Sequence, residues 1–248
     1  MTLEQFFAEN REVAIAFSGG VDSAYLLYAA TRYAARVKAY YVSTAFQPEF
    51  ELADARRLAA DVGADMLVLH VDVLMSGAVT ANPSDRCYHC KNTLFRQILR
   101  AAENDGFPVL LDGTNGSDDA GDRPGMRALR ELSVRSPLRE CGLTKAEIRR
   151  LSKEAGLFTW DKPAYACLAT RIRTGEEITL QKLKQTEKAE GFLFGLGFRD
   201  FRVRMVDNTA KLELREADLP LLLENREKIV TELRKDYDSV LLNLEVRK

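Results

Sequence analysis

The first two thirds of the chain alternate short apolar runs with amphipathic stretches. The apolar runs predict strands over 12–17, 37–43, 65–72 and 108–115, and the stretches between them predict helices over 21–35, 49–62 and 90–105. Short strands that alternate with helices are typical of a parallel sheet with crossover connections. Farther on, Thr144 and Glu147 fit a capping box that opens a helix, and Gly156 fits its end. The pattern predicts an α/β fold with helices flanking the sheet.

The order of elements changes after about residue 174. The pattern there predicts a helix near 179–196, two strands around 207–208, a helix near 218–235 and a final strand. In the strand over 201–205 the apolar residues share one face, which leaves Arg202 and Arg204 together on the other. We therefore expect two domains, an α/β domain over 1–173 and a smaller α+β domain over 174–248.

Composition adds limits to this picture. The chain is 46% hydrophobic and 29% charged, and its 36 basic and 37 acidic side chains give a formal net charge of −1. A near-neutral chain has no overall field that draws it to nucleic acid or to an anionic membrane. The first ten residues, MTLEQFFAEN, lack the basic and apolar regions of a secretory signal, and no apolar run is long enough for a membrane span. These features predict a cytoplasmic protein with reduced cysteines.

A glycine-rich turn follows the first predicted strand. Ser18, Gly19 and Gly20 stand between that strand and the next helix, with Asp22 and Ser23 in its first turn. Backbone N–H groups at a helix N-terminus form a natural phosphate site, and glycine lets the anion approach the backbone. The chain has no GxxxxGK[ST] motif, so a Walker loop is excluded. The alternative is a plain strand-to-helix turn that Ser or Asp caps.

Three cysteines are candidates for a metal or redox site. Cys87 and Cys90 are three apart at the start of a predicted helix, with Arg86 and Lys91 beside them to favour thiolates. If Cys167 folds back to meet them, three thiolates leave one iron of a 4Fe-4S cluster without a protein ligand.

Other interpretations of the cysteines remain open. A zinc site needs a fourth ligand, for which Cys141 and His89 are candidates, and the thiols can also be unligated. Cys141 by itself fits a packed thiol, and His70, at a strand end, fits a structural role.

The motif SGGVDS at 18–23 resembles the PP-loop of ATP pyrophosphatases, which cleave ATP between the α- and β-phosphates. The segments 112–129, 166–172 and 201–205 are similar, in order along almost the whole chain, to the LarE family of ATP-dependent sacrificial sulfur transferases. The resemblance implies a HUP-like first domain, Mg²⁺, and adenylation of a carboxylate of pyridinium-3,5-biscarboxylic acid mononucleotide. The carboxylate then becomes a thiocarboxylate, for a nickel-pincer cofactor.

The resemblance also implies how sulfur is supplied. In one branch of the family the cysteine at the position of Cys167 is itself the donor and is left as dehydroalanine. Another branch has a CxxC in addition and is thought to carry a 4Fe-4S cluster that holds a removable sulfide. Because this chain has Cys87 and Cys90, the resemblance places it in the cluster-bearing branch.

Further site residues follow partly from the resemblance and partly from their chemistry. Lys91 is similar in position to a lysine near the reacting phosphate, although a solvated helix lysine is the alternative. Asp112 follows a predicted strand, where α/β proteins bind nucleotide or metal. The second domain is expected to hold an anion clamp for the substrate's phosphate, with Arg202 and Arg204 otherwise on a solvated face. The clamp and the acidic positions that accompany it are Arg171, Arg202, Arg204, Glu190 and Glu213, of which periodicity alone puts both glutamates on the surface.

Two other functions compete with this one. A PP-loop tRNA thiolase shares the loop and the cluster chemistry but needs a broad basic surface, and a regulator that binds nucleotide or metal needs no turnover. The basic patch that would suit the thiolase consists of Arg123, Arg127, Arg130, Arg135 and Arg139. The resemblance further implies a homo-oligomer.

Overall fold

The computed structural model describes residues 1–118 and 124–247. Contacts divide the chain into two compact units, Met1–Val73 with Asp85–Lys162, and Leu74–Ser84 with Pro163–Lys248. The border therefore comes before the expected position near 174, and 74–84 joins the second unit. Backbone hydrogen bonds explain this: Gly175 N donates to Asn82 O at 2.8 Å, and Ile178 N donates to Thr80 O at 2.8 Å.

The described residues of the first unit form one sheet of four parallel strands, as the sequence pattern predicts. The strands are β1 (Glu12–Ala16), β2 (Arg36–Ser43), β3 (Asp65–His70) and β4 (Val109–Leu111), in the order β3-β2-β1-β4. Val13 of β1 pairs with Val37 of β2 on one side and Val109 of β4 on the other. The strands β2 and β3 are therefore added on one side of β1, and β4 is added on the other side. Open α/β sheets bind ligands at such a switch in strand order, beyond the carboxyl ends of the strands.

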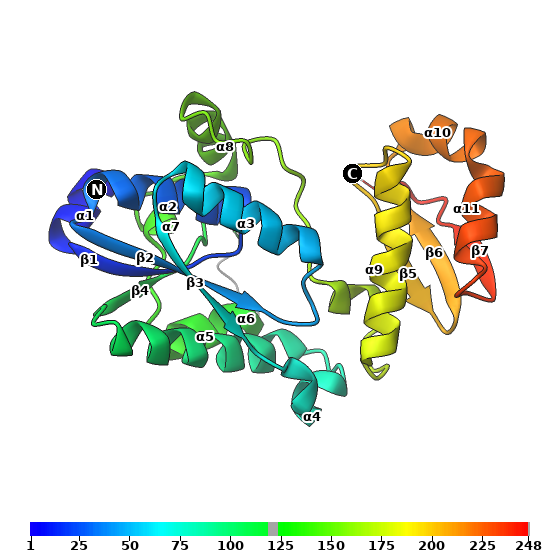
Figure 1. Cartoon of the computed structure of the whole chain (residues 1–248), viewed down its shortest axis with the longest axis horizontal. Helices are drawn as coiled ribbons and strands as arrows, with labels where there is room; N and C mark the ends of the chain where they lie inside the picture. Colours follow the sequence, from blue (N-terminus) through cyan, green and yellow to red (C-terminus); the bar gives the residue numbers. More distant parts are fainter. Residues whose placement is uncertain (119–123, 248) are drawn as a thin grey trace. The chain divides into compact units, whose positions relative to one another are not determined.

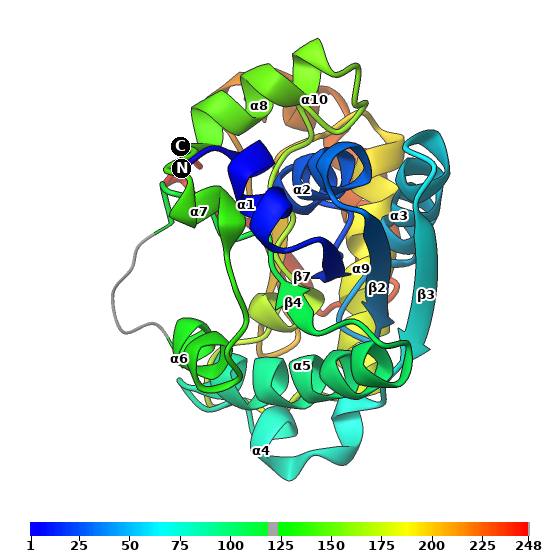
Figure 2. The same ribbon diagram turned by 90° about the vertical axis from the view of Figure 1, so that its left-hand side faces the viewer.

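Helices cover both faces of this sheet (Figure 1). The face with Val13 and Ile15 packs against α1 (Leu3–Glu9), α2 (Val21–Tyr33) and α3 (Glu49–Asp61), and the face with Ala14 and Tyr40 packs against α5 (Arg86–Asn104). The helix α6 (Pro124–Glu131) runs beside α5 (Figure 2). Two further helices, α7 (Pro137–Glu140) and α8 (Lys145–Glu154), follow β4 along the chain. The helix α1 is not among the elements that the sequence pattern predicts, although Thr2 and Gln5 form a capping box at its start.

The predicted capping box of α8 is confirmed. The Thr144 hydroxyl accepts a hydrogen bond from the Glu147 N–H, and the Glu147 carboxylate accepts one from the Thr144 N–H. Gly156 follows the helix with φ of +71°, a left-handed conformation that favours glycine.

The second unit is a smaller α+β fold with a mixed sheet. Its described strands are β5 (Arg202–Val206), β6 (Thr209–Glu213) and β7 (Ser239–Leu242), where β6 pairs antiparallel with β5 and parallel with β7. The α-helices are α4 (Gly77–Thr80), α9 (Leu180–Gly195), α10 (Leu219–Glu224) and α11 (Arg226–Leu233), and the 3₁₀ turns are η1 (Val73–Met75, which straddles the border of the units), η2 (Leu168–Arg171) and η3 (Glu216–Asp218). The single helix expected near 218–235 is two helices, because Asn225 leaves the helical conformation between them.

No helix within the described part of the chain combines the length and the apolar character needed to cross a membrane.

The loop after β4 approaches the start of α2 very closely. A Cβ atom at Gly113 would lie 2.9 Å from Ser23 N and 3.2 Å from Ser23 Cα. Backbone atoms cannot yield as the end of a flexible side chain can, so only glycine fits there. This contact fixes the loop after β4 against the first turn of α2.

We expect Gly113→Ala to destabilise the protein by about 1–3 kcal/mol, because the added methyl group overpacks a backbone contact. Urea denaturation measures the free energy of unfolding. The control is Gly191→Ala on α9, where an added Cβ meets nothing within 4 Å and alanine is the better helix former. A Gly113→Ala protein as stable as wild type would show that the two segments separate without cost.

Candidate functional site

The strand-to-helix turn at 17–23 leads into α2 without a side-chain cap. Gly20 is the N-cap residue of α2 and makes no side-chain capping bond, so the first-turn N–H groups have no side-chain partner from the cap. Gly19 has φ of +72°, and a Cβ there would lie 3.2 Å from Ala55 Cβ. Packing against α3 therefore requires glycine at position 19, and the uncapped helix start at Gly20 suits an anion.

Two serines close this turn from the inside. The Ser18 and Ser23 hydroxyl oxygens lie 3.0 Å apart, and Ser23 Oγ also donates to Gly20 O at 3.2 Å. Ser18 N in turn donates to Ser23 Oγ at 3.3 Å. Ser23 thus stabilises the turn itself. The N-cap residue of α2 is Gly20, so neither Ser23 nor Asp22 occupies the capping position.

Asp22 pairs with a lysine that sequence analysis did not identify. Lys145 Nζ, at the first position of α8, lies 2.5 Å from Asp22 Oδ2. The other carboxylate oxygen, Asp22 Oδ1, is buried and has no hydrogen-bond partner. Burying a carboxylate oxygen without a donor is costly, so this atom is the one in the turn that most needs a ligand. The sequence signal for Lys145 is the capping box at Thr144, which indicates that Lys145 begins a helix.

Asp112, expected to contact nucleotide or metal, is buried directly after β4. Its Oδ2 accepts a hydrogen bond from Thr114 Oγ1 at 2.5 Å, and its Oδ1 accepts one from Ser136 Oγ at 2.5 Å. The Asp112 N–H donates to Arg135 O at 2.9 Å. In this arrangement the carboxylate ties the loop after β4 to the segment before α7, and a direct ligand contact stays a prediction.

The CxxC pair lies at the start of α5. Cys87 is exposed and Cys90 is partly buried, and Arg86 Nη2 lies 3.8 Å from Cys87 Sγ. His89, the zinc alternative, has its Nε2 3.3 Å from Asp85 Oδ2. Lys91, one position beyond Cys90, packs its side chain over Gly125 of α6, where a Cβ would lie 3.1 Å from Lys91 Cδ.

The predicted third thiol belongs to the other unit. Cys167 is the N-cap residue of η2, whereas Cys87 and Cys90 lie on α5 in the first unit. Among the described residues, no group of three or more His, Cys, Asp or Glu side chains is arranged to hold a metal ion. The three-cysteine metal site stays a prediction.

A buried ion pair holds the segment that contains Cys167. Arg171 Nε and Nη2 donate to the two Glu190 oxygens at 2.8 and 3.0 Å, and the Arg171 side chain is 0% exposed. Arg171 Nη1 also donates to Ala166 O at 2.8 Å. Burial alone lowers the pKa of Arg171, but the hydrogen bond and charge of Glu190 outweigh burial and raise it. This pair fixes the backbone on either side of Cys167.

Glu190 is not the surface residue that periodicity predicted. It is 1% exposed, and its Oε1 also accepts a hydrogen bond from Val203 N at 2.9 Å, while Tyr165 donates its hydroxyl proton to Oε2. Tyr165, which sequence analysis missed, lies two residues before Cys167. The Tyr165 ring faces both Arg171, with Cζ 4.7 Å from the ring centroid, and Arg202, at 5.4 Å.

Arg202 is a buried cation with little carboxylate compensation. Its Nη1 donates to Phe201 O and its Nη2 to Ala164 O, both at 2.5 Å, and its ion pair with Asp200 spans 3.7 Å. Burial, followed by repulsion from Arg171 and Arg247, lowers the pKa of Arg202. A guanidinium in this environment gains from a bound anion.

The other two residues of the proposed clamp pair with each other. Arg204 Nε lies 3.0 Å from Glu213 Oε2, and Arg204 also donates to Thr170 O. Glu213 receives a second cation, because Arg247 Nη1 lies 3.8 Å away. Arg204 and Glu213 are both partly buried, so neither is a fully solvated strand residue.

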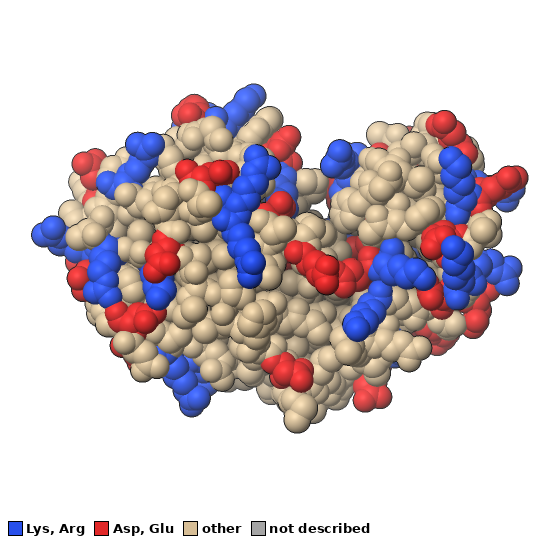
Figure 3. Space-filling view, in the orientation of Figure 1, with Lys and Arg blue, Asp and Glu red and all other residues tan. Residues whose placement is uncertain are grey.

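Two arginines of the basic patch considered for tRNA pair with carboxylates in the part of the chain that the structure describes, and a third bonds to a backbone carbonyl. Arg127 pairs with Glu131, Arg135 pairs with Glu140, and Arg139 donates to Asp118 O. Arg123 lies outside the described residues. On the face shown in Figure 3, basic and acidic side chains are interspersed without a broad area of one sign.

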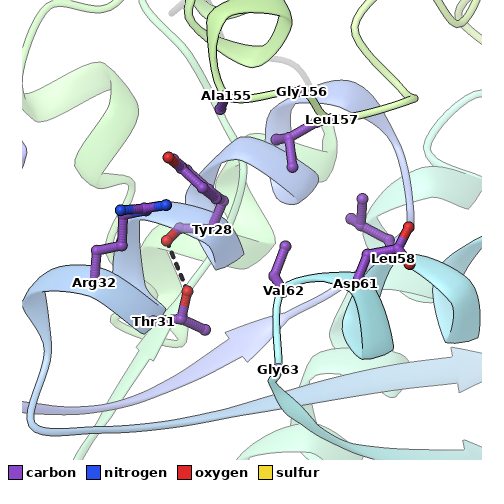
Figure 4. Close-up of a pocket in the computed structure, with 10 residues that line it drawn as sticks. All are labelled: Tyr28, Thr31, Arg32, Leu58, Asp61, Val62, Gly63, Ala155, Gly156 and Leu157. Carbon is purple, nitrogen blue, oxygen red and sulfur yellow. Dashed lines mark hydrogen bonds between the residues drawn. The ribbon is translucent and has the colours of Figure 1, made fainter.

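A cavity of about 410 Å³ lies at the C-terminal ends of α2, α3 and α8, whereas the glycine turn lies at the N-terminal end of α2. Figure 4 shows its walls, which come from α2, the end of α3 and the residues after α8, with Thr31 Oγ1 donating to Tyr28 O. Arg32 and Asp61 supply its charged groups, and none of the predicted site residues lines it. Helix C-termini carry partial negative charge, so a phosphate fits the turn at 17–23 better than this cavity.

Comparison with known proteins gives matches over most of the chain. The family model described as asparagine synthase matches residues 4–155. An uncharacterised Synechocystis protein is 40% identical over 215 residues, 86% of this chain and 80% of its own length. An uncharacterised Methanocaldococcus jannaschii protein is 31% identical over 240 residues, 96% of this chain and 91% of its own. The pyridinium-3,5-bisthiocarboxylic acid mononucleotide synthase of Lactiplantibacillus plantarum is 32% identical over 218 residues, 87% of this chain and 79% of its own.

We expect Glu190→Gln to lower the free energy of unfolding by about 3–5 kcal/mol, because it leaves the buried Arg171 charge uncompensated. Urea denaturation followed by circular dichroism measures this loss. The matched control is Glu154→Gln, which removes an ion pair with Arg150 whose side chains are 58% and 61% exposed, and it should change stability little. Equal effects of the two substitutions would contradict the assigned role of Glu190.

Proposed function

The chain belongs to the PP-loop ATP pyrophosphatase family, as the match to the asparagine synthase model shows, and we propose that this ATP-using enzyme is a sulfur transferase of the LarE type. Its substrate is a carboxylate of pyridinium-3,5-biscarboxylic acid mononucleotide, which it converts to a thiocarboxylate. The observation that carries the proposal is the glycine turn at 18–23, which leads into α2 without a side-chain cap and lies where the strand order switches between β1 and β4. The 32% identity to the Lactiplantibacillus plantarum synthase supports the substrate.

The first half of the reaction belongs to the turn. An oxygen of the substrate carboxylate attacks the α-phosphorus of ATP, the bond from that phosphorus to the bridging oxygen breaks, and pyrophosphate leaves. The N–H groups of Gly19 and the first turn of α2 stabilise negative charge as it develops on the leaving group. Asp22 fits Mg²⁺, because its buried Oδ1 has no other partner, and the ion would neutralise phosphate charge there. We also propose that Lys91 and Asp112 act near the nucleotide.

The second half replaces AMP with sulfur. Hydrosulfide attacks the carbonyl carbon of the acyl adenylate, the bond to the AMP oxygen breaks, and a thiocarboxylate and AMP are released with one proton. AMP is a good leaving group, whereas a free carboxylate oxygen is not. We assign this step to the Cys167 segment, whose backbone Arg171 fixes.

The acceptor's phosphate is assigned to the second unit. Arg202 is the strongest candidate, because it is buried, carries a lowered pKa and has mainly carbonyl partners. Arg171 and Arg204 lie in the same unit, and Glu190 and Glu213 hold them in place. We assign all five to substrate binding, with the two glutamates as positioning residues.

We further propose that Cys87, Cys90 and Cys167 hold a 4Fe-4S cluster. The donor set fits, since thiolates are the ligands of such clusters and Cys87 and Cys90 lie about one helical turn apart at the start of α5. When bound, the cluster would supply an iron without a protein ligand, at which sulfide is held. We also propose a homo-oligomer in the cytoplasm.

Turnover with defined reactants tests the function. With ATP, Mg²⁺, the biscarboxylate mononucleotide and sulfide, we expect AMP, pyrophosphate and thiocarboxylate in equal amounts, measured by liquid chromatography with mass spectrometry. Cys167→Ser should abolish the thiocarboxylate but retain acceptor-dependent pyrophosphate release. ATP binding without AMP release would instead favour a regulator, and tRNA binding with a steep salt dependence would favour a thiolase.

Metal analysis after anaerobic reconstitution tests the cluster. We expect about four irons and four acid-labile sulfides per chain, and loss of most iron in Cys87→Ser. Cys141→Ser is the control, because burial raises the pKa of the Cys141 thiol and so disfavours the thiolate that a metal requires. Zinc alone would contradict the cluster. Full multiple turnover by Cys87→Ser with none by Cys167→Ser would favour Cys167 as a single sulfur donor.

A further inference from the structure

We propose that Asn82 is a positioning residue for the three thiols, because it binds the backbone that follows Cys167 to the backbone that leads into Cys87. Asn82 lies in the short segment between β3 and α5 that belongs to the second unit. The inference rests on the proposed function for the role of the thiols, and it deepens that proposal by naming a residue that sets their spacing. Asn82 acts through the two segments and is not itself a ligand.

Asn82 is buried in an unusual backbone conformation. It is 0% exposed, and its φ of +52° lies in the left-handed region that asparagine adopts more readily than most residues. Its N–H donates to Val79 O at 3.1 Å. A buried side-chain amide is costly unless it is hydrogen-bonded, so the partners of this amide determine what the residue holds.

The amide of Asn82 binds the end of the turn that Cys167 begins. Cys167 is the N-cap residue of η2, and Ile172 is its C-cap residue. Asn82 Nδ2 donates to Arg173 O at 2.8 Å and to Ile172 O at 3.4 Å. The Asn82 carbonyl oxygen accepts a hydrogen bond from Gly175 N at 2.8 Å. One buried residue thus fixes the backbone directly after η2.

The two ends of η2 are held by different residues. Before the turn, Arg171 donates to Ala166 O, and Glu190 fixes Arg171 in its turn. After the turn, the backbone is held by Asn82. A shift of η2 that moves Cys167 must therefore break a buried hydrogen bond at one end, which is costly. Of these two attachments, only the one at Asn82 leads along the chain toward α5.

Asn82 is close in sequence to the other two thiols. Only residues 83–85 separate it from α5, which carries Cys87 and Cys90 in its first two turns. Pro83 fixes one φ in this connection, so few backbone torsions remain free. The thiolates of a 4Fe-4S site bind different irons of one rigid cluster, so their spacing must be set by the protein. Residues that orient metal ligands typically change metal affinity by about 10–100-fold.

A purely structural role for Asn82 makes a different prediction. Loss of its hydrogen bonds would then destabilise the second unit but leave thiol spacing and iron retention unchanged in folded protein. Under our proposal both change in protein that is still folded. Asn225 is the matched control, because Asn225 Nδ2 also donates to a main-chain oxygen of the same unit, Leu221 O at 3.0 Å, and α10, which ends there, carries no cysteine.

Crosslinking of the metal-free full chain tests the spacing. In a Cys90→Ser parent, a short bismaleimide should join Cys87 to Cys167, and mass spectrometry of tryptic peptides gives the initial rate. Asn82→Gly keeps the left-handed conformation but loses the amide, and we expect it to lower this rate at least about threefold, because the two thiols lose a shared tether. Asn82→Asp, which keeps the size but replaces the donor with an acceptor, should act alike. Asn225→Gly should match the parent.

Iron release tests the consequence for the cluster. After anaerobic reconstitution with all cysteines present, we expect Asn82→Gly to lose iron to a chelator at least about tenfold faster than wild type. Asn225→Gly should lose iron at the wild-type rate. Circular dichroism on the same samples confirms that each variant is folded.

Parent-like crosslinking in both Asn82 variants would overturn the inference, as would an equal decrease in Asn225→Gly, no crosslink in the parent, or iron loss in Asn82→Gly as slow as in wild type. Crosslinking needs no iron, ATP or acceptor. A wild-type chain that binds zinc alone, with a crosslink that depends on Asn82, would therefore refute the proposed cluster and leave the positioning of the thiols by Asn82 standing. Normal cluster loading with rates that Asn82 does not affect would do the reverse.

Discussion

The candidate phosphate site depends on a close approach between backbone segments. Gly113, after β4, leaves no room for a side chain against Ser23 N, and Gly19 meets Ala55 of α3 at a similarly short distance. The first contact holds the loop after β4 against the first turn of α2, and the second holds the loop after β1 against α3, beside the switch in strand order between β1 and β4. The groups that face a phosphate are then main-chain N–H groups, whose positions are set by packing and do not depend on side-chain rotamers.

The residues proposed for substrate binding in the second unit are held by a different means, a buried ion pair. Arg171 and Glu190 are almost fully excluded from water, and such a pair is stable only when its remaining donors and acceptors are also satisfied. Tyr165 and Val203 supply the further hydrogen bonds to Glu190. Because Arg171 also binds Ala166 O, the position of Cys167 follows from this network more than from the short 3₁₀ turn that comes after it.

Local sequence signals predicted the fold well and the charge pairing poorly. Alternating apolar runs identified the four strands, and the Thr144–Glu147 box identified the start of α8, because these signals need only neighbouring residues. Glu190 looked like a surface position because periodicity scores any charge as exposed, whereas its partner Arg171 lies 19 residues away. Lys145 and Asp22 are 123 residues apart, so only the folded chain reveals their contact. Gly113 likewise gains its meaning from the helix packed against it.

Among the described residues, each unit has a charged group that its neighbours do not fully satisfy, and the two groups have opposite signs. In the first unit the buried Asp22 Oδ1 has no donor, which favours a cation. In the second, burial and neighbouring guanidinium groups lower the pKa of Arg202, which favours an anion. An undercompensated buried charge costs stability, and a ligand that neutralises it returns that free energy as affinity. Metal-bound ATP and a phosphorylated carboxylate, the substrates proposed above, have charges that complement these two groups. Under the proposed function, this electrostatic cost in the ligand-free protein would contribute to the affinity for both substrates.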